Sequence, residues 1–259
     1  MDTFGLSEPL ATALHASLRS ARKIVVFSGA GASAESGVPT FRDAQLGLWE
    51  RFKPEDLATP QGFRRNPRLV WGWYEWRRAL VSQAIPNAGH LAIAEWGKAR
   101  NLTIITQNVD DLHERAGSGP VIHLHGSLFS ARCFACSHPH ELPPINPSSS
   151  EAQHESDPPY CARCGGPIRP GVVWFGESLP QNEWHEAQEA CSQSDLLVCL
   201  GTSALVYPAA SLPEIASRRG AAIVQVNPNP TELDSLADYV IRGAAADVMP
   251  RIVKVATAL

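Results

Sequence analysis

The sequence predicts an α/β fold, in which a doubly wound parallel sheet carries a smaller inserted module. Short runs of β-branched and apolar residues, typical of buried parallel strands, alternate with helical stretches along the chain. A glycine-rich loop directly follows the first of these runs. Four cysteines fall within residues 132–170, a proline-rich segment with little periodicity, which indicates a separate small module.

Length and composition limit the possible classes of protein. The 259 residues are enough for one large domain with a small module. The net charge of −4 and pI of about 6.1 give no indication of a nucleic-acid or membrane surface. The sequence has no apolar run near the roughly 18 residues that a membrane span requires, and its N-terminal stretch does not read as a secretory signal. We therefore expect a cytoplasmic protein that acts as a monomer.

Local patterns give the individual elements. Leu10, Leu14 and Leu18 repeat at helical spacing and predict a first helix. Further helices are predicted at 70–84, a stretch dense in tryptophan, and at 90–98. Buried strands are predicted at 23–28, 102–106, 121–124, 195–200, 222–226 and 239–241.

The loop after the first strand has the pattern of a dinucleotide site. Gly29 to Ala34 fits G-x-G-x-x-G/A, in which the first glycine permits a tight turn and the second lets the backbone approach a pyrophosphate at a helix N-terminus. The acidic residue that usually ends the second strand, about 20 residues on, is missing. Glu50 and Glu55 lie at that distance but among turn and helix signals. We therefore expect the adenosine ribose to be held from elsewhere in the chain.

The cysteines form two C-x-x-C pairs, Cys133 with Cys136 and Cys161 with Cys164, separated by 24 residues. Each pair places two thiolates on one tight turn, so the two turns complete a tetrahedral sulfur shell that suits Zn²⁺. Such a shell has no open position, which makes the predicted zinc structural. Two disulfides, which a cytoplasmic chain disfavours, and a redox C-x-x-C are the alternatives.

Six motifs, taken together, resemble the sirtuins, which are NAD-dependent protein-lysine deacylases. They are GAGASAESGVPTFRD at 29–43, Gln107-Asn108-Val109-Asp110, His125-Gly126, the four cysteines, Gly201-Thr202-Ser203 and Val226-Asn227-Pro228-Asn229. The resemblance extends from about Arg22 to Val255. It implies a Rossmann-like large domain formed by 1–43, 87–131 and 171–259. A small domain, comprising the helical insertion 44–86 and the zinc module 132–170, would face it across a cleft.

The chemistry that the resemblance implies is acyl transfer to ADP-ribose. In sirtuins the acyl-lysine carbonyl oxygen attacks the nicotinamide ribose and nicotinamide leaves. A histidine then acts as general base on the ribose hydroxyls. The match places this base at His125, and a base poised near neutral pH is a natural task for histidine. We expect His123, two residues earlier, to point to the opposite side of the strand and to be packed or solvated.

The resemblance also implies which residues contact NAD. Phe41 and Arg42 would cover the nicotinamide ribose, and Asn108 with Asp110 would bind the carboxamide. Asn227 and Asn229 look like the adenosine-ribose contacts that are missing near the first loop. The full set is Gly29, Ala30, Gly31, Ala32, Glu35, Thr40, Phe41, Arg42, Gln107, Asn108, Val109, Asp110, Gly201, Thr202, Ser203, Asn227, Pro228, Asn229 and Ala245.

Two further segments match those that bind the substrate backbone in sirtuins. An acyl-lysine peptide would add as a strand between Val172–Glu177 and Val206-Tyr207-Pro208, with affinity from main-chain hydrogen bonds and little sequence selectivity. The predicted substrate-binding residues are Val172, Phe175, Gly176 and Glu177 in the first segment and Val206 in the second.

The sequence YEWR on the predicted helix bears on the acyl group. Tyr74 and Arg77 are three residues apart and share one helix face, and an arginine beside a phenol suits a carboxylate. The same Tyr-x-x-Arg occurs in sirtuins that prefer succinyl- or malonyl-lysine, and Ala58 matches the small residue that widens the pocket mouth there. Alternatively, Tyr74 packs and Arg77 is a solvated helix residue, like Arg78 beside it. Acetyl removal would persist, because a site for succinyl need not exclude acetyl.

Other functions use the same residues differently. A mono-ADP-ribosyltransferase would use the same NAD site. A non-catalytic NAD- or zinc-dependent module is disfavoured, since a pure binder would not need His125 as a base. A conventional dehydrogenase is the least favoured, because the second-strand acid is absent.

Overall fold

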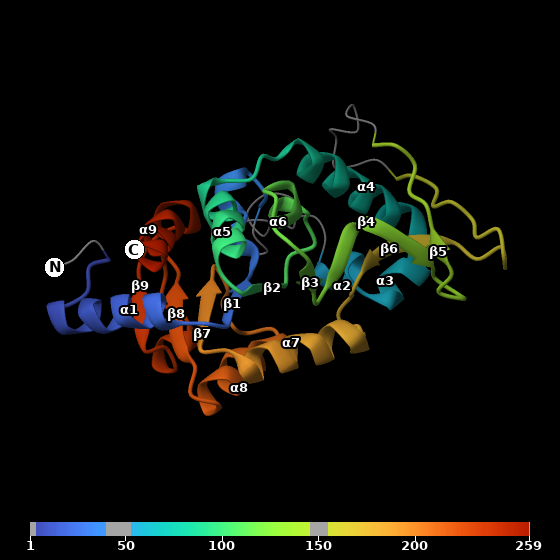
Figure 1. Ribbon diagram of the computed structural model, residues 1–259. Helices are drawn as coiled ribbons and strands as arrows, with labels where there is room; N and C mark the ends of the chain where they lie inside the picture. Colours follow the sequence, from blue (N-terminus) through green and yellow to red (C-terminus); the bar gives the residue numbers. More distant parts are fainter. Residues whose placement is uncertain (1–3, 40–52, 146–154, 259) are drawn as a thin grey trace.

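The large sheet forms the centre of the molecule in the computed structural model, which describes residues 4–39, 53–145 and 155–258 (Figure 1). Its six strands are all parallel and follow the order β3-β2-β1-β7-β8-β9. Their bounds are β1 Ile24–Ser28, β2 Leu102–Thr106, β3 Val121–His123, β7 Leu196–Leu200, β8 Ala222–Val226 and β9 Tyr239–Ile241. The predicted doubly wound parallel sheet is confirmed, with most strand bounds within one residue of those expected.

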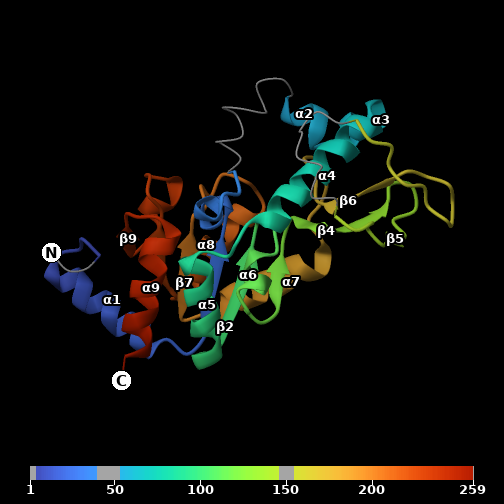
Figure 2. The same ribbon diagram turned by 90° about the horizontal axis from the view of Figure 1, so that it is seen from above.

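Helices cover both faces of this sheet, as Figures 1 and 2 show. The helices α1 (Glu8–Ser20), α5 (Ala88–Ala99) and α9 (Ala245–Thr257) pack on one face, and α7 (Gln181–Gln193) and α8 (Leu212–Arg218) on the other. Alternate residues of β1 point to the two faces, so Val26 joins the first core and Phe27 the second. Because both faces are buried, the strands are mostly apolar.

The smaller part of the molecule lies at the end away from α1 and α9 (Figures 1 and 2). It contains α2 (Pro54–Leu57), α3 (Pro60–Arg65), α4 (Pro67–Gln83) and an antiparallel sheet of order β5-β4-β6. The strands of this sheet are β4 Gly126–Cys133, β5 Pro139–His140 and β6 Ile168–Val172, and the short helix α6 (Leu112–Arg115) precedes β3.

The ends of the tryptophan-rich helix follow from its sequence. The predicted helix at 70–84 begins earlier, at Pro67, because the Asn66 side chain caps it by accepting a hydrogen bond from the Leu69 N–H at 3.1 Å. Proline at the first helical position costs no hydrogen bond there. The domain boundaries predicted at 131/132 and 170/171 stay predictions; β4 and β6 each run across one of them.

Candidate functional site

Two loops meet at the carboxyl edge of the large sheet, where the strand order reverses between β1 and β7. The Gly29 N–H donates to the Leu200 carbonyl and the Gly31 N–H to the Gly201 carbonyl, both at 2.9 Å. Open α/β sheets bind ligands at such a switch point, outside the carboxyl ends of the strands. This edge is therefore the candidate site.

Glycines allow these two loops to touch through their backbones. A Cβ atom on Gly31 would lie 2.8 Å from the Gly201 Cα, and one on Gly29 would lie 2.9 Å from the Thr202 Cα. Gly201 has a φ of +59°, and a Cβ there would collide with the backbone nitrogen of Ala32. The three glycines are thus required by the packing of the two loops against each other.

The helix expected to begin at the glycine loop is absent from residues 29–39. The chain instead forms two 3₁₀ turns, Ala30–Ala32 and Ala34–Ser36, the second of which ends at Gly37 with a φ of +80°. The predicted helix N-terminus is therefore wrong. The left-handed residue at 37 stops the turns before an α-helix can form.

Three buried polar side chains connect the glycine loop to the segment after β2. The Ser33 hydroxyl donates to Asp110 Oδ2 at 2.9 Å, and Asn108 Nδ2 donates to the Ser33 Oγ at 3.0 Å. Burial raises the pKa of Asp110, while hydrogen bonds from Leu112 and Ser33 oppose that rise. We call Ser33, Asn108 and Asp110 the polar cluster. Ser33 is a residue that the sequence reasoning missed; its signal was a lone hydroxyl among the alanines of the loop.

His125 has the hydrogen bonding of a neutral general base. Its Nδ1 lies 3.0 Å from the Gln107 carbonyl oxygen, which can only accept, so Nδ1 holds the proton and Nε2 presents a lone pair. Burial lowers the pKa of His125, which keeps the ring neutral near pH 7. The Gln107 side chain donates to Thr202 Oγ1 at 2.8 Å, so the base is linked to the loop after β7.

Tight backbone packing fixes the position of His125. Gly126 has a φ of +73°, and a Cβ there would collide with the Gly171 carbonyl. The Val173 N–H donates to the His125 carbonyl at 2.8 Å. His123 is held differently: its Nε2 lies 2.6 Å from Glu114, and although burial lowers its pKa, this carboxylate raises it overall.

A pair of buried histidines underlies this edge of the sheet. The rings of His90 and His113 are 4.9 Å apart, and burial lowers their pKa values to about 4 and about 3. His113 Nε2 is 2.9 Å from the Ser28 Oγ, at the end of β1. The sequence reasoning did not find this pair, because its members come from different elements and neither belongs to a recognisable spacing.

The loops after β7 and β8 also join at this edge. Asn227 Nδ2 donates to the Thr202 carbonyl at 3.1 Å, and Asn227 Oδ1 accepts from the Asn229 N–H at 3.1 Å. Pro228 and Asn229 are exposed and Ser203 is half-buried.

Glu35, in the second 3₁₀ turn, reaches the start of α9. Its Oε2 accepts from the Ala246 N–H at 2.7 Å, beside Ala245. The Val109 carbonyl, in contrast, accepts from the Leu128 N–H and faces the smaller part of the molecule. Thr40, Phe41 and Arg42 lie outside the described residues. The structure therefore brings the other predicted cofactor residues to one sheet edge, and their individual roles stay predictions.

Tyr74 and Arg77 lie together on α4, near the polar cluster. Tyr74 is 5% exposed, and its hydroxyl accepts from Trp174 Nε1 at 3.0 Å. Arg77 is half-buried, its guanidinium carbon lies 4.9 Å from the centre of the Trp73 ring, and it has no hydrogen bond or ion pair within the described residues. Burial lowers the pKa of Arg77, and the nearby Tyr74 and Asp110 raise it.

Arg78 differs from what the sequence suggested. It is buried, forms an ion pair with Glu75 at 2.7 Å and donates to the Pro143 carbonyl at 2.9 Å. The comparison of Arg77 with a solvated Arg78 is therefore wrong: Arg78 ties α4 to the segment after β5.

In the first of the two segments predicted to bind a peptide, most backbone N–H groups already have partners within the protein. The N–H groups of four residues after β6 are already paired within the chain, namely Val173, Trp174, Phe175 and Glu177. That segment therefore offers mainly carbonyl oxygens to a peptide. Phe175 and Val206 are 48% and 41% exposed, and the Ala58 carbonyl accepts from the Phe175 N–H at 2.9 Å. Val172 pairs with Gly126 in the small sheet, and Gly176 has a φ of +84°.

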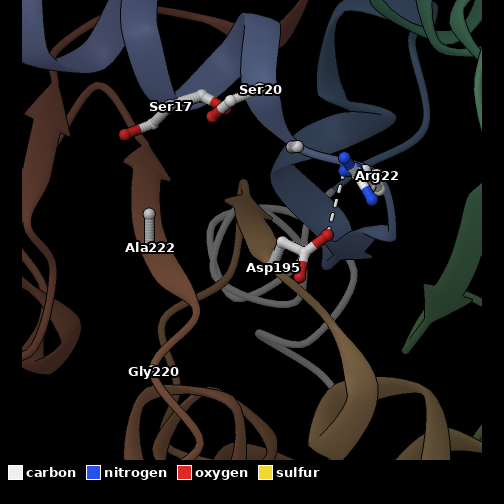
Figure 3. A pocket seen from close by; sticks show the side chains of 7 residues that line it. Ser17, Ser20, Arg22, Asp195, Gly220 and Ala222 are labelled. Atoms are coloured by element: carbon white, nitrogen blue, oxygen red, sulfur yellow. Dashed lines mark hydrogen bonds between the residues drawn. The ribbon is translucent and has the colours of Figure 1, made fainter.

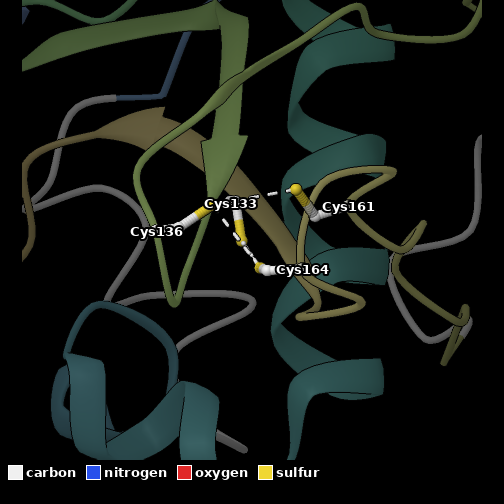
Figure 4. Close-up of side chains that lie close together, drawn as sticks. All are labelled: Cys133, Cys136, Cys161 and Cys164. Carbon is white, nitrogen blue, oxygen red and sulfur yellow. Dashed lines mark hydrogen bonds between the residues drawn. The ribbon is translucent and has the colours of Figure 1, made fainter.

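Four cysteine sulfurs converge between the end of β4 and the 161–164 turn (Figure 4). The four Sγ atoms lie within 4.8 Å of one another, at 3.4, 3.4 and 3.8 Å for three of the pairs. A tetrahedral Zn²⁺ with bonds of about 2.3 Å places its sulfurs about 3.8 Å apart, so the donor set fits this metal. The cysteines are free thiols, which disfavours the two-disulfide alternative.

A separate cavity of about 540 Å³ lies at the opposite, amino edge of the large sheet (Figure 3). Its lining includes Ser17, Ser20, Arg22, Asp195, Gly220 and Ala222. Asp195 Oδ2 accepts from the N–H groups of Arg22 and Lys23, both at 2.9 Å. These hydrogen bonds link the segments that precede β1 and β7. This cavity is on the far side of the sheet from His125. Among the described helices, none has the length and apolar character to cross a bilayer.

Fold and site together define an α/β protein with a sheet switch point, a histidine with the hydrogen bonding of a general base, and four converging cysteines that could hold a metal ion. The Sir2 family model matches residues 29–208. A protein of Methylococcus capsulatus named NAD-dependent protein deacylase is 58% identical over 93% of this chain and 95% of its own. A protein of the same name from Mycobacterium tuberculosis is 53% identical over 90% and 97%.

Solved structures give the same result. A Sir2 homologue–NAD complex has a TM-score of 0.86 and 46% identity, over 95% of this chain and 93% of the other. Sir2Af2 bound to a myristoylated histone peptide has a TM-score of 0.76 and 35% identity, over 96% and 97%. The chain belongs to the Sir2 family, which confirms the resemblance to sirtuins.

Proposed function

We propose that this chain is an NAD-dependent protein-lysine deacylase that yields nicotinamide and O-acyl-ADP-ribose. The observation that carries the proposal is His125, a neutral base whose Nε2 lone pair lies at the same sheet edge as the glycine loop and the polar cluster. The two relatives from Methylococcus capsulatus and Mycobacterium tuberculosis, both named NAD-dependent protein deacylase, support the same activity.

Residues at the carboxyl edge of the sheet would hold NAD. The loops of Gly29, Gly31 and Gly201, which pack backbone to backbone, would receive the diphosphate, and Asn227 with Ala245 would lie toward the adenosine. The polar cluster would bind the nicotinamide carboxamide, since an amide and a carboxylate satisfy both of its hydrogen-bonding groups. When bound, NAD supplies the ribosyl carbon that accepts the acyl oxygen.

His125 would accept a proton at Nε2 from a ribose hydroxyl. The Gln107 carbonyl holds Nδ1–H and therefore keeps this tautomer in place before and during proton transfer. The link from Gln107 to Thr202 ties the base to the loop that would contact the diphosphate, so the base and the dinucleotide are positioned by one set of contacts.

The four cysteines would hold a structural Zn²⁺. With four cysteine thiolates as ligands, the metal would have no open coordination position for substrate. The metal would hold the end of β4 against the 161–164 turn and so stabilise the smaller part of the molecule.

We also propose a preference for acidic acyl groups, succinyl or malonyl, with acetyl removal retained. Arg77 carries this proposal, because it is a half-buried cation that forms no ion pair in the described part of the chain, although the Asp110 carboxyl is near enough to raise its pKa. Burying such a charge is unfavourable unless an anion accompanies it, and an acyl carboxylate would supply one. Tyr74 beside it can donate to the same carboxylate.

Mass spectrometry of a succinyl-lysine peptide and its acetyl twin, with and without NAD, tests the function. We expect NAD-dependent loss of both groups, with succinyl lost faster. Label transfer from NAD to protein without an acyl product would instead indicate a mono-ADP-ribosyltransferase. Cytoplasmic location, a monomeric state and the absence of nucleic-acid binding stay predictions, as does the addition of the peptide as a strand.

Substitution of Arg77 by methionine tests the acyl preference. Arg77→Met removes the charge but keeps much of the side chain's volume, so succinyl turnover is expected to fall about tenfold to a hundredfold while acetyl turnover changes little. An equal loss on both peptides would contradict the assignment. Arg64→Met, on the neighbouring helix α3, is the matched control.

A further inference from the structure

We infer that Trp174 is a positioning residue for the proposed acyl site: its indole N–H fixes the Tyr74 hydroxyl, and the partly buried Arg169–Glu177 ion pair fixes the indole. The inference rests on the proposed acidic-acyl function and concerns how Tyr74 is oriented in that site. Trp174 is not part of the Tyr-x-x-Arg pattern; it comes from the segment after β6, a hundred positions along the chain from Tyr74.

The direction of the hydrogen bond determines what Tyr74 can offer. An indole N–H can only donate, so the Tyr74 oxygen accepts from Trp174 Nε1 at 3.0 Å. The phenol proton then points elsewhere, and no acceptor for it occurs among the residues that the structure describes. Burial raises the pKa of Tyr74, so this proton is retained at neutral pH. Tyr74 is thereby set as a donor, next to the Arg77 cation.

The indole is itself held on several sides. The Arg169 Cζ lies 3.4 Å from the centre of the Trp174 ring, a stacked arrangement that attracts the cation to the ring face. The rings of Phe63 and Phe134 lie 5.4 and 6.3 Å away and restrict rotation. Trp174 is almost fully buried, so its orientation is set by these neighbours rather than by water.

Glu177 completes the arrangement. Its carboxylate pairs with both terminal nitrogens of Arg169, and Oε2 also accepts from the Trp174 backbone N–H at 2.9 Å. Arg169 is buried, and an ion pair of this bidentate kind compensates its charge. The Glu177 side chain is thus engaged inside the protein, and we assign it to holding Arg169 and Trp174 rather than to contacting substrate.

The test is Trp174→Phe, which removes the donor and keeps an aromatic ring. We expect KM for the succinyl-lysine peptide to rise about fivefold, the effect of roughly one hydrogen bond, while kcat and the acetyl KM change less than about twofold. In a Tyr74→Phe background the same substitution should have no further effect on the succinyl KM, because the oxygen that the indole orients is gone.

Trp96→Phe is the matched control. Trp96 is a buried tryptophan whose Nε1 has no hydrogen-bond partner within the described ranges, so the loss of volume is similar without the loss of a contact. Equal rises in KM on both peptides, or additive effects of Trp174→Phe and Tyr74→Phe, would overturn the positioning role and indicate packing alone.

A second readout does not depend on activity. The chain has seven tryptophans, and the Trp174 indole N–H signal in an NMR spectrum can be assigned by its loss in Trp174→Phe. In Tyr74→Phe this signal should move upfield and exchange faster with solvent; an unchanged signal overturns the contact. If the wild type shows no succinyl preference, the proposed acyl function fails. If it does and Trp174→Phe keeps that preference, only the present inference fails.

Discussion

The carboxyl edge of the large sheet and the Tyr74–Arg77 site are built in opposite ways. The sheet edge is made of backbone: three glycines let two loops touch, and main-chain hydrogen bonds hold them. The Tyr74–Arg77 site is made of side chains that pack between α4 and the segment after β6. The backbone edge therefore tolerates few substitutions, whereas a single exchange can alter the other site and leave the fold intact.

Removal of the metal is expected to give the largest difference between the two regions, because it should affect peptide turnover and not NAD binding. Metal binding contributes folding free energy to the element that holds it, so chelation should abolish peptide turnover by disordering the smaller part of the molecule. NAD binding, measured by titration calorimetry, should persist because the large sheet has its own core. Cys164→Ala should act in the same way as chelation, and Cys191→Ala, in the large core, should retain zinc. A parallel loss of NAD affinity would show that the regions are not independent.

Substitution of the proposed base comes next in size. His125→Ala should lower kcat by about 10²- to 10⁴-fold, the usual contribution of a general base. NAD affinity should be nearly unchanged, since the His125 imidazole is hydrogen-bonded to the Gln107 carbonyl and not to the glycine loop that would hold the diphosphate. His123→Ala is the matched control, as that ring is paired with Glu114. Similar losses of kcat in both variants would contradict the assignment.

Gly201→Ala tests the backbone edge directly. A side chain at φ +59°, in collision with the Gly31–Ala32 backbone, should lower the free energy of unfolding by about 3 kcal/mol and weaken NAD binding. Urea unfolding measures the first effect. Gly220→Ala also has a positive φ, +89°, but open space around it, so it separates strain from collision. Equal destabilisation in the two variants would refute the role of loop contact.

The smallest expected effect concerns pH. Burial lowers the pKa of His90 from 6.5 to about 4, so the folded protein binds fewer protons than the unfolded chain between these values. The stability is therefore complete above pH 6.5 and is lost as the pH falls, by about 2 kcal/mol at pH 5 from this residue. His90→Leu should flatten the pH dependence of urea unfolding in this range. His185→Leu, at an exposed histidine, should not.

Prediction from the sequence succeeded where the signal was local. The strands at 102–106, 222–226 and 239–241 have the predicted bounds, because strands that are buried on both faces consist of continuous apolar and β-branched runs. Helix α7 was missed because its face is mostly polar and buries only Ala187 and Cys191. Strand β6 was missed because it contains Pro170 and Gly171; its pairing with β4 overrides propensity.

In the candidate site, too, residues with a local sequence signal could be predicted and residues without one were missed. The motif residues could be predicted because each motif is contiguous in sequence. Ser33, the His90–His113 pair and Trp174 could not, since their roles come from partners in other elements. The glycine loop gave the right location and the wrong local conformation: the pattern indicates close backbone approach but does not specify the conformation of the residues after it.

Strand β4 begins at Gly126, directly after the proposed base, and ends at Cys133, a proposed metal ligand. Eight fully extended residues would span at most about 26 Å, and the irregular pairing between Ser127 and Ala131 shortens this span. This strand therefore limits the distance between the proposed base His125 and the proposed metal site. A one-residue insertion would also turn the remaining side chains to the opposite face. The irregular pairing between Ser127 and Ala131 is where such a change would be absorbed at least cost.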